Sequence, residues 1–218
     1  MNLFSEITFL LRKEATLELR HKYAISGILL YVTSTVFVIY LSFIKVDPTV
    51  WNTLFWIVSL FASINAVMKS FFQENSARQL FYFQLVNPIA VILSKIIYNI
   101  CLLFIINVLT FVMMTIMVGN PINNTPQYFL AILLGSIGFS ITFTFISAIA
   151  AKANNSATMM AILSFPVVLP ILVTLIKLSK SAIRNTDTAW ASDVLMLGAI
   201  DMILIALCFL LFPFLWRD

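Results

Sequence analysis

Charged residues are scarce in this 218-residue sequence. Asp, Glu, Lys and Arg together make up 10% of it, whereas apolar residue types make up 61%. A soluble domain of this length carries about a quarter charged residues. With a mean hydropathy of +1.03, the chain has too little polar side-chain surface to cover a globule in water. The composition therefore excludes a soluble globular domain and indicates a protein embedded in lipid.

Glycine is also scarce, with five residues, and no G-x-x-x-x-G-K-[ST] sequence occurs. A loop of that kind cradles the phosphates of ATP in P-loop ATPases. The H-E-x-x-H motif and paired catalytic groups are absent as well. We therefore expect no catalytic residues, and no ATPase site or other enzyme activity in this chain.

Metal-ligating residues are few. His21 is the only histidine, and Cys101 and Cys208 both lie in apolar runs without any Cys/His cluster. A single histidine does not make a His-based metal site, and a buried cysteine behaves as a small apolar residue. The sequence therefore predicts no metal site, no cofactor bound by this chain alone and no disulfide framework.

Long charge-free runs are present instead. A helix needs roughly 20 apolar residues to cross a membrane, and backbone groups in lipid must be paired within a helix or a closed barrel. These runs lack the alternation of barrel strands, so we predict an all-α integral membrane protein with a single domain over residues 1–218. Six transmembrane helices are expected, at about 24–44, 51–68, 97–118, 128–151, 157–176 and 194–215.

Lys and Arg residues are unevenly divided between the two sides of this topology. If the N-terminus is cytoplasmic, nine of the 13 lie inside: Arg12, Lys13, Arg20, Lys22, Lys69, Arg78, Lys95, Lys152 and Arg217. The other four are Lys45, Lys177, Lys180 and Arg184. By the positive-inside rule, both termini are predicted to be cytoplasmic. The basic balance suits anionic lipid rather than nucleic acid, and the polar segment 177–193 is expected to be an interfacial loop or a short amphipathic helix outside.

Residues 1–23 contain no helix breaker and place apolar residues along one side of an expected helix. Such a helix would lie at the membrane surface, with its apolar stripe in the headgroup boundary. Glu14 and Glu18 interrupt the stripe one turn apart, with Lys13 and Arg20 close by. Two interpretations stay open: a salt-bridged interfacial helix, and a docking surface for a cytoplasmic partner.

Residues 69–95 are predicted to form the first cytoplasmic loop, which mixes aromatic and charged residues. Glu74, Arg78 and Tyr82 would line one side of a short helix within it. The asparagine before Pro88 then turns the chain toward the third span, because a residue preceding proline avoids helical backbone angles. The short helix suits a groove on another protein and equally suits an aromatic belt at headgroup depth.

The later spans contain glycines, prolines and one acidic residue that bear on how the helices pack. Gly135 and Gly138 give the fourth helix a face that another helix could approach closely. Pro166 and Pro170 remove backbone donors and are expected to kink the fifth helix; the kink either improves packing, lines a cleft or acts as a hinge. Asp201, the single charge in the last span, is either a hydrogen-bond partner in packing or dimerisation, or part of a proton relay.

Three blocks of the sequence resemble the haem exporter protein B family, the membrane subunit of the cytochrome c maturation ABC transporter. The first is LLRKEATLELRHK (10–22), matched at Lys13, Glu14, Glu18 and Arg20. The second lies in 70–95, matched at Phe71, Glu74, Leu80, Pro88 and Lys95. The third is LLGSIGFSITFTFISAIAAKANNSATMMAILSFPVVLPILV (133–173), which has an L-G-x-x-G-F start, an A-x-A-A-K helix end and an F-P-x-x-x-P sequence.

The resemblance implies an ABC-2-like permease that draws on ATP hydrolysis by a separate ATPase subunit. It would deliver haem, or release a loaded haem chaperone, on the outer side of the bacterial inner membrane. The residues expected to couple to the ATPase are Phe71, Glu74, Arg78, Leu80, Tyr82 and Pro88. The helix over 1–23 would brace them.

The same resemblance implies partners beyond the ATPase: a second copy of the chain, a haem-handling membrane subunit, a haem chaperone and membrane lipids. Haem would be handled by the complex, with its iron held by partner subunits, and ATP would bind the partner ATPase. Two alternatives remain open, namely an ABC permease exporting another lipophilic substrate and a membrane scaffold without transport.

Overall fold

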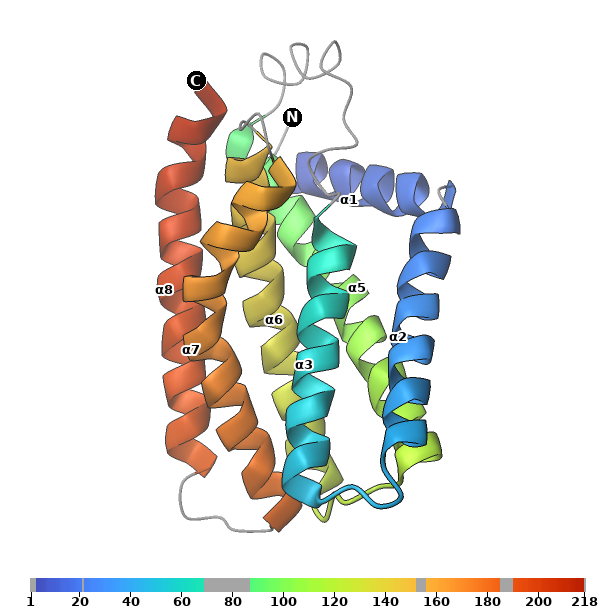
Figure 1. Ribbon diagram of the computed structural model, residues 1–218. Helices are drawn as coiled ribbons and strands as arrows, with labels where there is room; N and C mark the ends of the chain where they lie inside the picture. Colours follow the sequence, from blue (N-terminus) through green and yellow to red (C-terminus); the bar gives the residue numbers. More distant parts are fainter. Residues whose placement is uncertain (1–2, 21, 69–86, 152–155, 185–189, 218) are drawn as a thin grey trace.

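The computed structural model describes residues 3–20, 22–68, 87–151, 156–184 and 190–217, and within these ranges it contains helices and no strands. The helices are α1 (Leu3–Arg20), α2 (Lys22–Ser42), α3 (Pro48–Val67), α5 (Pro88–Val118), α6 (Thr125–Ala150), α7 (Ser156–Arg184) and α8 (Trp190–Arg217). Helices α2, α3 and α5 to α8 run side by side as a bundle, and α1 lies across one end of it (Figure 1).

Five of these helices, α3, α5, α6, α7 and α8, are long and apolar enough to cross a membrane. The described apolar part of α2, Ser26–Ser42, is shorter than that length. The prediction of an all-helical membrane protein is therefore confirmed, whereas the sixth span remains a prediction.

Two helices extend beyond the boundaries expected from the sequence. Helix α5 begins at Pro88, so residues 88–95 are its first two turns and not part of a loop. Helix α7 continues to Arg184, which places the first half of the polar segment 177–193 in a helix continuous with the fifth span. Lys and Ser are tolerated in helices, and the last turns of α7 contain no glycine or proline that would end the helix earlier.

Two helices begin in the same way, with an Asp or Asn residue followed directly by proline. Asp47 caps α3 and Asn87 caps α5, each accepting a hydrogen bond of 3.0 Å from the backbone N–H two residues on. Pro48 and Pro88 follow directly, where the missing N–H leaves no helical bond unmade. Pro88 thus fixes the point at which the chain enters the longest helix of the bundle.

A polar seam joins α5 to α6 in the interior of the bundle. The Asn99 amide donates to the Thr144 hydroxyl at 2.8 Å, and the Asn107 amide donates to Ser136 at 3.0 Å. Between them, the Ser140 hydroxyl donates to a backbone carbonyl of α5 at 2.9 Å. In lipid, where no water competes, such bonds set the register of neighbouring helices.

A second set of buried contacts joins α3 to α7. The Trp56 indole N–H donates to the Ser179 hydroxyl at 2.8 Å, and the Asn52 amide donates to the Ile176 carbonyl at 3.1 Å. The Trp56 ring meets Phe55 edge-on, with 5.1 Å between centroids. These contacts hold a fully buried indole in one orientation, which matters for the neighbouring glycine of α6.

Candidate functional site

Helix α1 is attached to the first turns of α5 by an apolar contact. Ile7 and Leu10 of α1 are buried against Ala90 and Val91 of α5. Part of the apolar stripe expected in the headgroup boundary therefore packs on the protein itself, whereas Leu3 at its start is exposed. Sequence reasoning missed this because an amphipathic helix has the same pattern whether its apolar face meets lipid or another helix.

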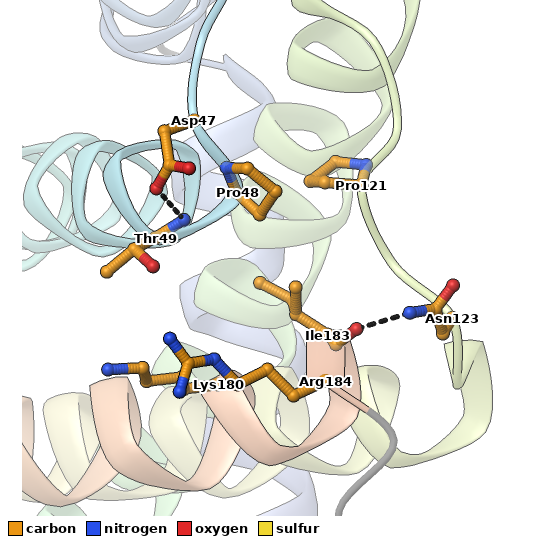
Figure 2. A pocket seen from close by; sticks show the side chains of 8 residues that line it. All are labelled: Asp47, Pro48, Thr49, Pro121, Asn123, Lys180, Ile183 and Arg184. Atoms are coloured by element: carbon orange, nitrogen blue, oxygen red, sulfur yellow. Dashed lines mark hydrogen bonds between the residues drawn. The ribbon is translucent and has the colours of Figure 1, made fainter.

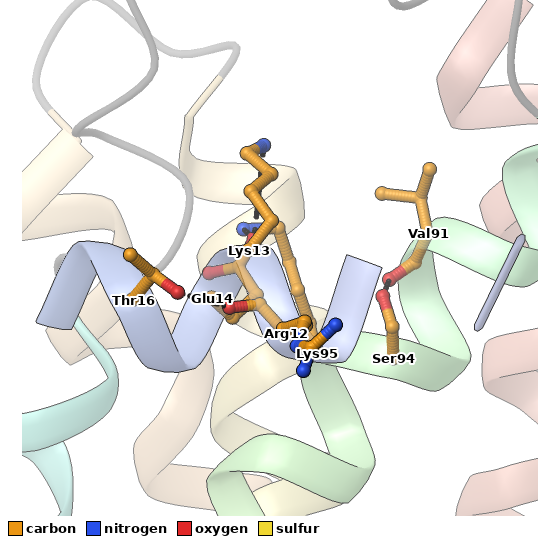
Figure 3. A network of polar contacts seen from close by, with 7 residues as sticks. All are labelled: Arg12, Lys13, Glu14, Thr16, Val91, Ser94 and Lys95. Atoms are coloured by element: carbon orange, nitrogen blue, oxygen red, sulfur yellow. Dashed lines mark hydrogen bonds and ion pairs between the residues drawn. The ribbon is translucent and has the colours of Figure 1, made fainter. Parts of the chain in front are cut away.

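A buried ion pair lies beside this contact (Figure 3). Lys95 Nζ of α5 is 3.0 Å from Glu14 Oε1 of α1, and the two side chains are 2% and 14% exposed. Lys13 Nζ lies 3.9 Å from the same carboxylate oxygen and is 22% exposed. Removing one partner of a buried pair typically costs 3–5 kcal/mol, because the other charge is left without compensation. The pair therefore fixes how α1 sits on α5.

The opposite side of α1 carries large exposed side chains. Phe4 is 78% exposed and Phe9 is 65% exposed, and Arg12 is exposed between them and the helix end. The interfacial and docking interpretations of this helix both call for such a face. Glu18 and Arg20 also belong to α1, but their side chains fall outside the part of the structure that is described.

The expected ATPase-coupling residues precede this junction in the sequence. Phe71, Glu74, Arg78, Leu80 and Tyr82 lie outside the described residues. Pro88, the last of the set, is the first residue of α5. Lys95 follows seven positions later, so the segment that contains the residues expected to couple leads directly into the turns that α1 contacts.

The two glycines of α6 make room for side chains of neighbouring helices. A Cβ placed on Gly135 would lie 2.7 and 2.8 Å from two ring carbons of Trp56. A Cβ on Gly138 would lie 2.7 Å from Asp201 Oδ1 of α8 and 3.2 Å from Ile171 of α7. The close approach expected here is therefore made by a tryptophan and an aspartate.

The prolines and the acidic residue of the later spans have different surroundings. Helix α7 is one continuous helix through Pro166 and Pro170, and the Thr174 hydroxyl donates to the Pro170 carbonyl at 2.8 Å. Asp201 is 4% exposed, and neither carboxylate oxygen has a hydrogen-bond partner among the described residues. Asp201 is therefore covered by residues of its own chain, and its role in packing, dimerisation or a proton relay stays a prediction.

Among the residues that the structure describes, no three His, Cys, Asp or Glu side chains gather where they could hold an ion.

A family model described as CcmB protein matches residues 5–214, which takes in most of α1, all of α2 to α7 as described above and most of α8. No curated protein matches the sequence.

Proposed function

This chain belongs to the CcmB family, the haem exporter protein B family, and is thus a membrane component of the haem exporter of cytochrome c maturation; we propose that it acts there as the permease subunit. A separate ATPase subunit would bind and hydrolyse ATP, since the sequence contains no P-loop. The chain would pair with a second copy of itself, and the two copies together would form the transport pathway, since two-fold pairs are the commonest homo-oligomers. The complex would lie in the bacterial inner membrane with both termini of this chain in the cytoplasm.

The observation that supports coupling is the Glu14–Lys95 ion pair between α1 and α5. A force applied to the segment before Pro88 would reach α5 at its first turn, and α1 would move with it because of the buried pair. Packed helices respond to such forces as rigid bodies with few discrete arrangements. We propose that nucleotide-driven closure of the ATPase pair displaces α1 and the start of α5 together.

The α5–α6 polar seam gives that displacement a route into the bundle. Asn99 lies one turn beyond Lys95 on α5 and is bonded to Thr144 of α6. A shift at the start of α5 therefore acts on α6, which packs against α3, α7 and α8 as well. The permease would supply this movement, while haem-handling partners hold the iron and a haem chaperone accepts the product outside.

The experiment that tests the coupling proposal exchanges the two charges. Glu14→Lys should reduce copurification of the ATPase subunit and the yield of c-type cytochromes, and the double variant Glu14→Lys/Lys95→Glu should recover most of both. Lys13→Gln is the matched control, because its ammonium is farther from the carboxylate and more exposed. Membrane levels of each variant are measured in parallel. Full ATPase association in Glu14→Lys at normal membrane levels would remove the coupling role of α1.

The segment before Pro88 is tested separately. Glu74→Ala together with Arg78→Ala should lower ATPase copurification without lowering the amount of permease in the membrane. Unchanged association and cytochrome assembly would contradict the assignment of these residues.

The two alternative functions give different results. For a permease that exports another lipophilic compound, deletion would alter tolerance to that compound and leave c-type cytochromes intact. For a scaffold, reconstitution with the ATPase would leave the rate of ATP hydrolysis unchanged.

A further inference from the structure

At the end of the bundle opposite α1, the start of α3, the loop before α6 and the end of α7 enclose a cavity of about 230 Å³ (Figures 1 and 2). Lys180 and Arg184 extend along one wall of it from the last turns of α7, and Asp47, Pro48 and Pro121 form the facing side. The α1–α5 junction is at the other end of the bundle, so this cavity is separate from the candidate coupling site.

The charges that line the cavity are unbalanced. Lys180 and Arg184 are spaced four residues apart and so share one face of α7. Neither forms an ion pair with any residue the structure describes. The Asp47 carboxylate also lines the cavity, and its Oδ2 accepts the Thr49 N–H at 3.0 Å and caps α3. Two cations and one carboxylate therefore line the cavity, which leaves its described lining with an excess of positive charge.

The walls are held in place before any ligand arrives. The Asn123 amide donates to the Ile183 carbonyl, and the Asn124 N–H donates to the Ala182 carbonyl at 2.9 Å. These two bonds tie the loop before α6 to the end of α7. Pro48 and Pro121, whose rings fix the backbone torsion φ, close the opposite side. A site that is already ordered loses less entropy on binding.

We propose that this cavity binds a single oxyanion, a phosphate or a carboxylate, carried by an amphiphile at the membrane boundary. A guanidinium presents a planar fork to such a group, and an ammonium adds a point charge. The cavity is smaller than the roughly 300–1,000 Å³ of pockets that enclose drug-sized ligands, so it takes the charged group and leaves the apolar body outside. Phe43 and Ile44, both exposed in the loop leading to Asp47, offer that body an apolar surface.

Two sources carry this chemistry. One is the headgroup of an anionic phospholipid, and the other is a carboxylate of the transported compound, such as a haem propionate. The oxyanion site itself is independent of the proposed function, whereas the second source rests on it.

The test uses the full-length protein in nanodiscs of phosphatidylcholine to which phosphatidylglycerol is added, with retained lipid counted by native mass spectrometry. Lys180→Gln/Arg184→Gln should lower the apparent affinity for phosphatidylglycerol roughly 10-fold or more, since a direct hydrogen bond to a charged group contributes about 1.5–3 kcal/mol. The matched control, Lys45→Gln/Lys177→Gln, also removes two positive charges from this end of the protein without touching the cavity, and should change the affinity little.

Further measurements keep the proposal falsifiable. Arg184→Lys retains the charge and should keep most of the binding, while melting in pure phosphatidylcholine shows whether the double variant is folded. An equal loss in the cavity variant and the Lys45/Lys177 control would overturn the site, because only diffuse surface charge would then be at work. Unchanged binding in a folded cavity variant would overturn it as well.

Competition identifies the source. Haem that displaces phosphatidylglycerol, while haem with esterified propionates does not, supports the site with a substrate carboxylate as ligand. Binding of phosphatidylglycerol that depends on Lys180 and Arg184 and resists haem supports the site with a phospholipid as ligand. Loss of the coupling role in the Glu14 and Lys95 variants would leave both results unaffected, so the two proposals fail separately.

Discussion

Gly135→Ala is expected to destabilise the bundle, although alanine favours helices. The new Cβ would lie 2.7 and 2.8 Å from ring carbons of Trp56 and 3.1 Å from a methyl of Leu175, whereas carbon atoms in good contact are about 3.5–4.0 Å apart. The Trp56 ring cannot easily move away, because its N–H donates to the Ser179 hydroxyl at 2.8 Å and its ring contacts Phe55 edge-on.

The size of the effect follows from two opposed terms. Overpacking a filled interior costs about 1–3 kcal/mol. The cost at Gly135 should lie at the upper end of that range, because the new Cβ would meet the rigid Trp56 ring as well as Leu175. Replacing glycine by alanine within a helix contributes about 1 kcal/mol in the favourable direction. The net loss is therefore roughly 2 kcal/mol. Gly198→Ala on α8 is the control, because its added Cβ would have no described atom within 4 Å apart from its chain neighbours and the backbone of its own helix, so it should be neutral or slightly stabilising.

The assay is unfolding of the detergent-solubilised protein, followed by circular dichroism as denaturant is added. A double-mutant cycle with Trp56→Phe isolates the contact, since the smaller ring removes the outer atoms of the indole. Gly135→Ala should cost at least about 1 kcal/mol less in that background. Equal stability of Gly135→Ala and Gly198→Ala, or a cycle with no coupling, would refute the account of this packing.

Three further results are expected in the same unfolding assay. Gly138→Ala should destabilise the protein, because its added Cβ overlaps the Asp201 side chain. Adding Asp201→Ala should restore part of the lost stability, whereas adding Asp201→Asn, which keeps the overlapping atoms, should not. If the asparagine also restored stability, the charge of Asp201 and not its volume would be the cause. Glu14→Gln should cost about 3–5 kcal/mol, and Lys13→Gln less than about 1 kcal/mol; equal costs would contradict the role given to the buried pair. Ser179→Ala leaves the indole N–H of α3 unpaired and should cost about 1–3 kcal/mol, so a neutral result would show that the N–H has another acceptor.

The sequence predicts the class of this protein for direct physical reasons. Scarce charge and long apolar runs leave only a membrane-spanning helical architecture. Helices α3 and α5 begin earlier than the predicted positions 51 and 97, because Asp47-Pro48 and Asn87-Pro88 each place an acceptor side chain before a residue that needs no donor. The far end of α7 was harder to place, since Lys177, Lys180 and Arg184 indicate the end of lipid but not the end of a helix.

The candidate site was only partly predictable. Lys13 and Glu14 were expected on an interfacial helix, and Lys95 was expected among the charges on the cytoplasmic side. The ion pair between Glu14 and Lys95 was not predicted. The two residues are 81 positions apart in the sequence, so no helical period connects them. The cavity at the end of the bundle opposite α1 was not predicted for the same reason: Lys180 was expected in an interfacial segment and Asp47 was not singled out, and tertiary packing brings them to one cavity.

The α5–α6 polar seam did leave a trace in the sequence. Ser136, Ser140 and Thr144 recur every four residues in a charge-free run, which places three hydroxyls on one face of a helix. Hydropathy averages hide such a face, because hydroxyls weigh little beside Leu and Phe. The partners Asn99 and Asn107 could not be assigned, because any neighbouring helix could have supplied them.

The contacts of α5 with α6 and with α1 therefore respond differently to the substitution of a single residue. Each bond of the seam contributes on average about 0.6 kcal/mol, as measured between helices in membranes, so loss of Asn107 alone should leave the register of α5 on α6 intact. Among the described residues, the contact with α1 includes the Glu14–Lys95 ion pair and an apolar contact, and one substitution at Glu14 removes this ion pair. Asn107→Leu and Glu14→Gln separate these cases. Proteolysis should begin in α1 for Glu14→Gln and remain as in the unaltered protein for Asn107→Leu. Equal protection of α1 in both would mean that α1 is held chiefly by its apolar contact with α5.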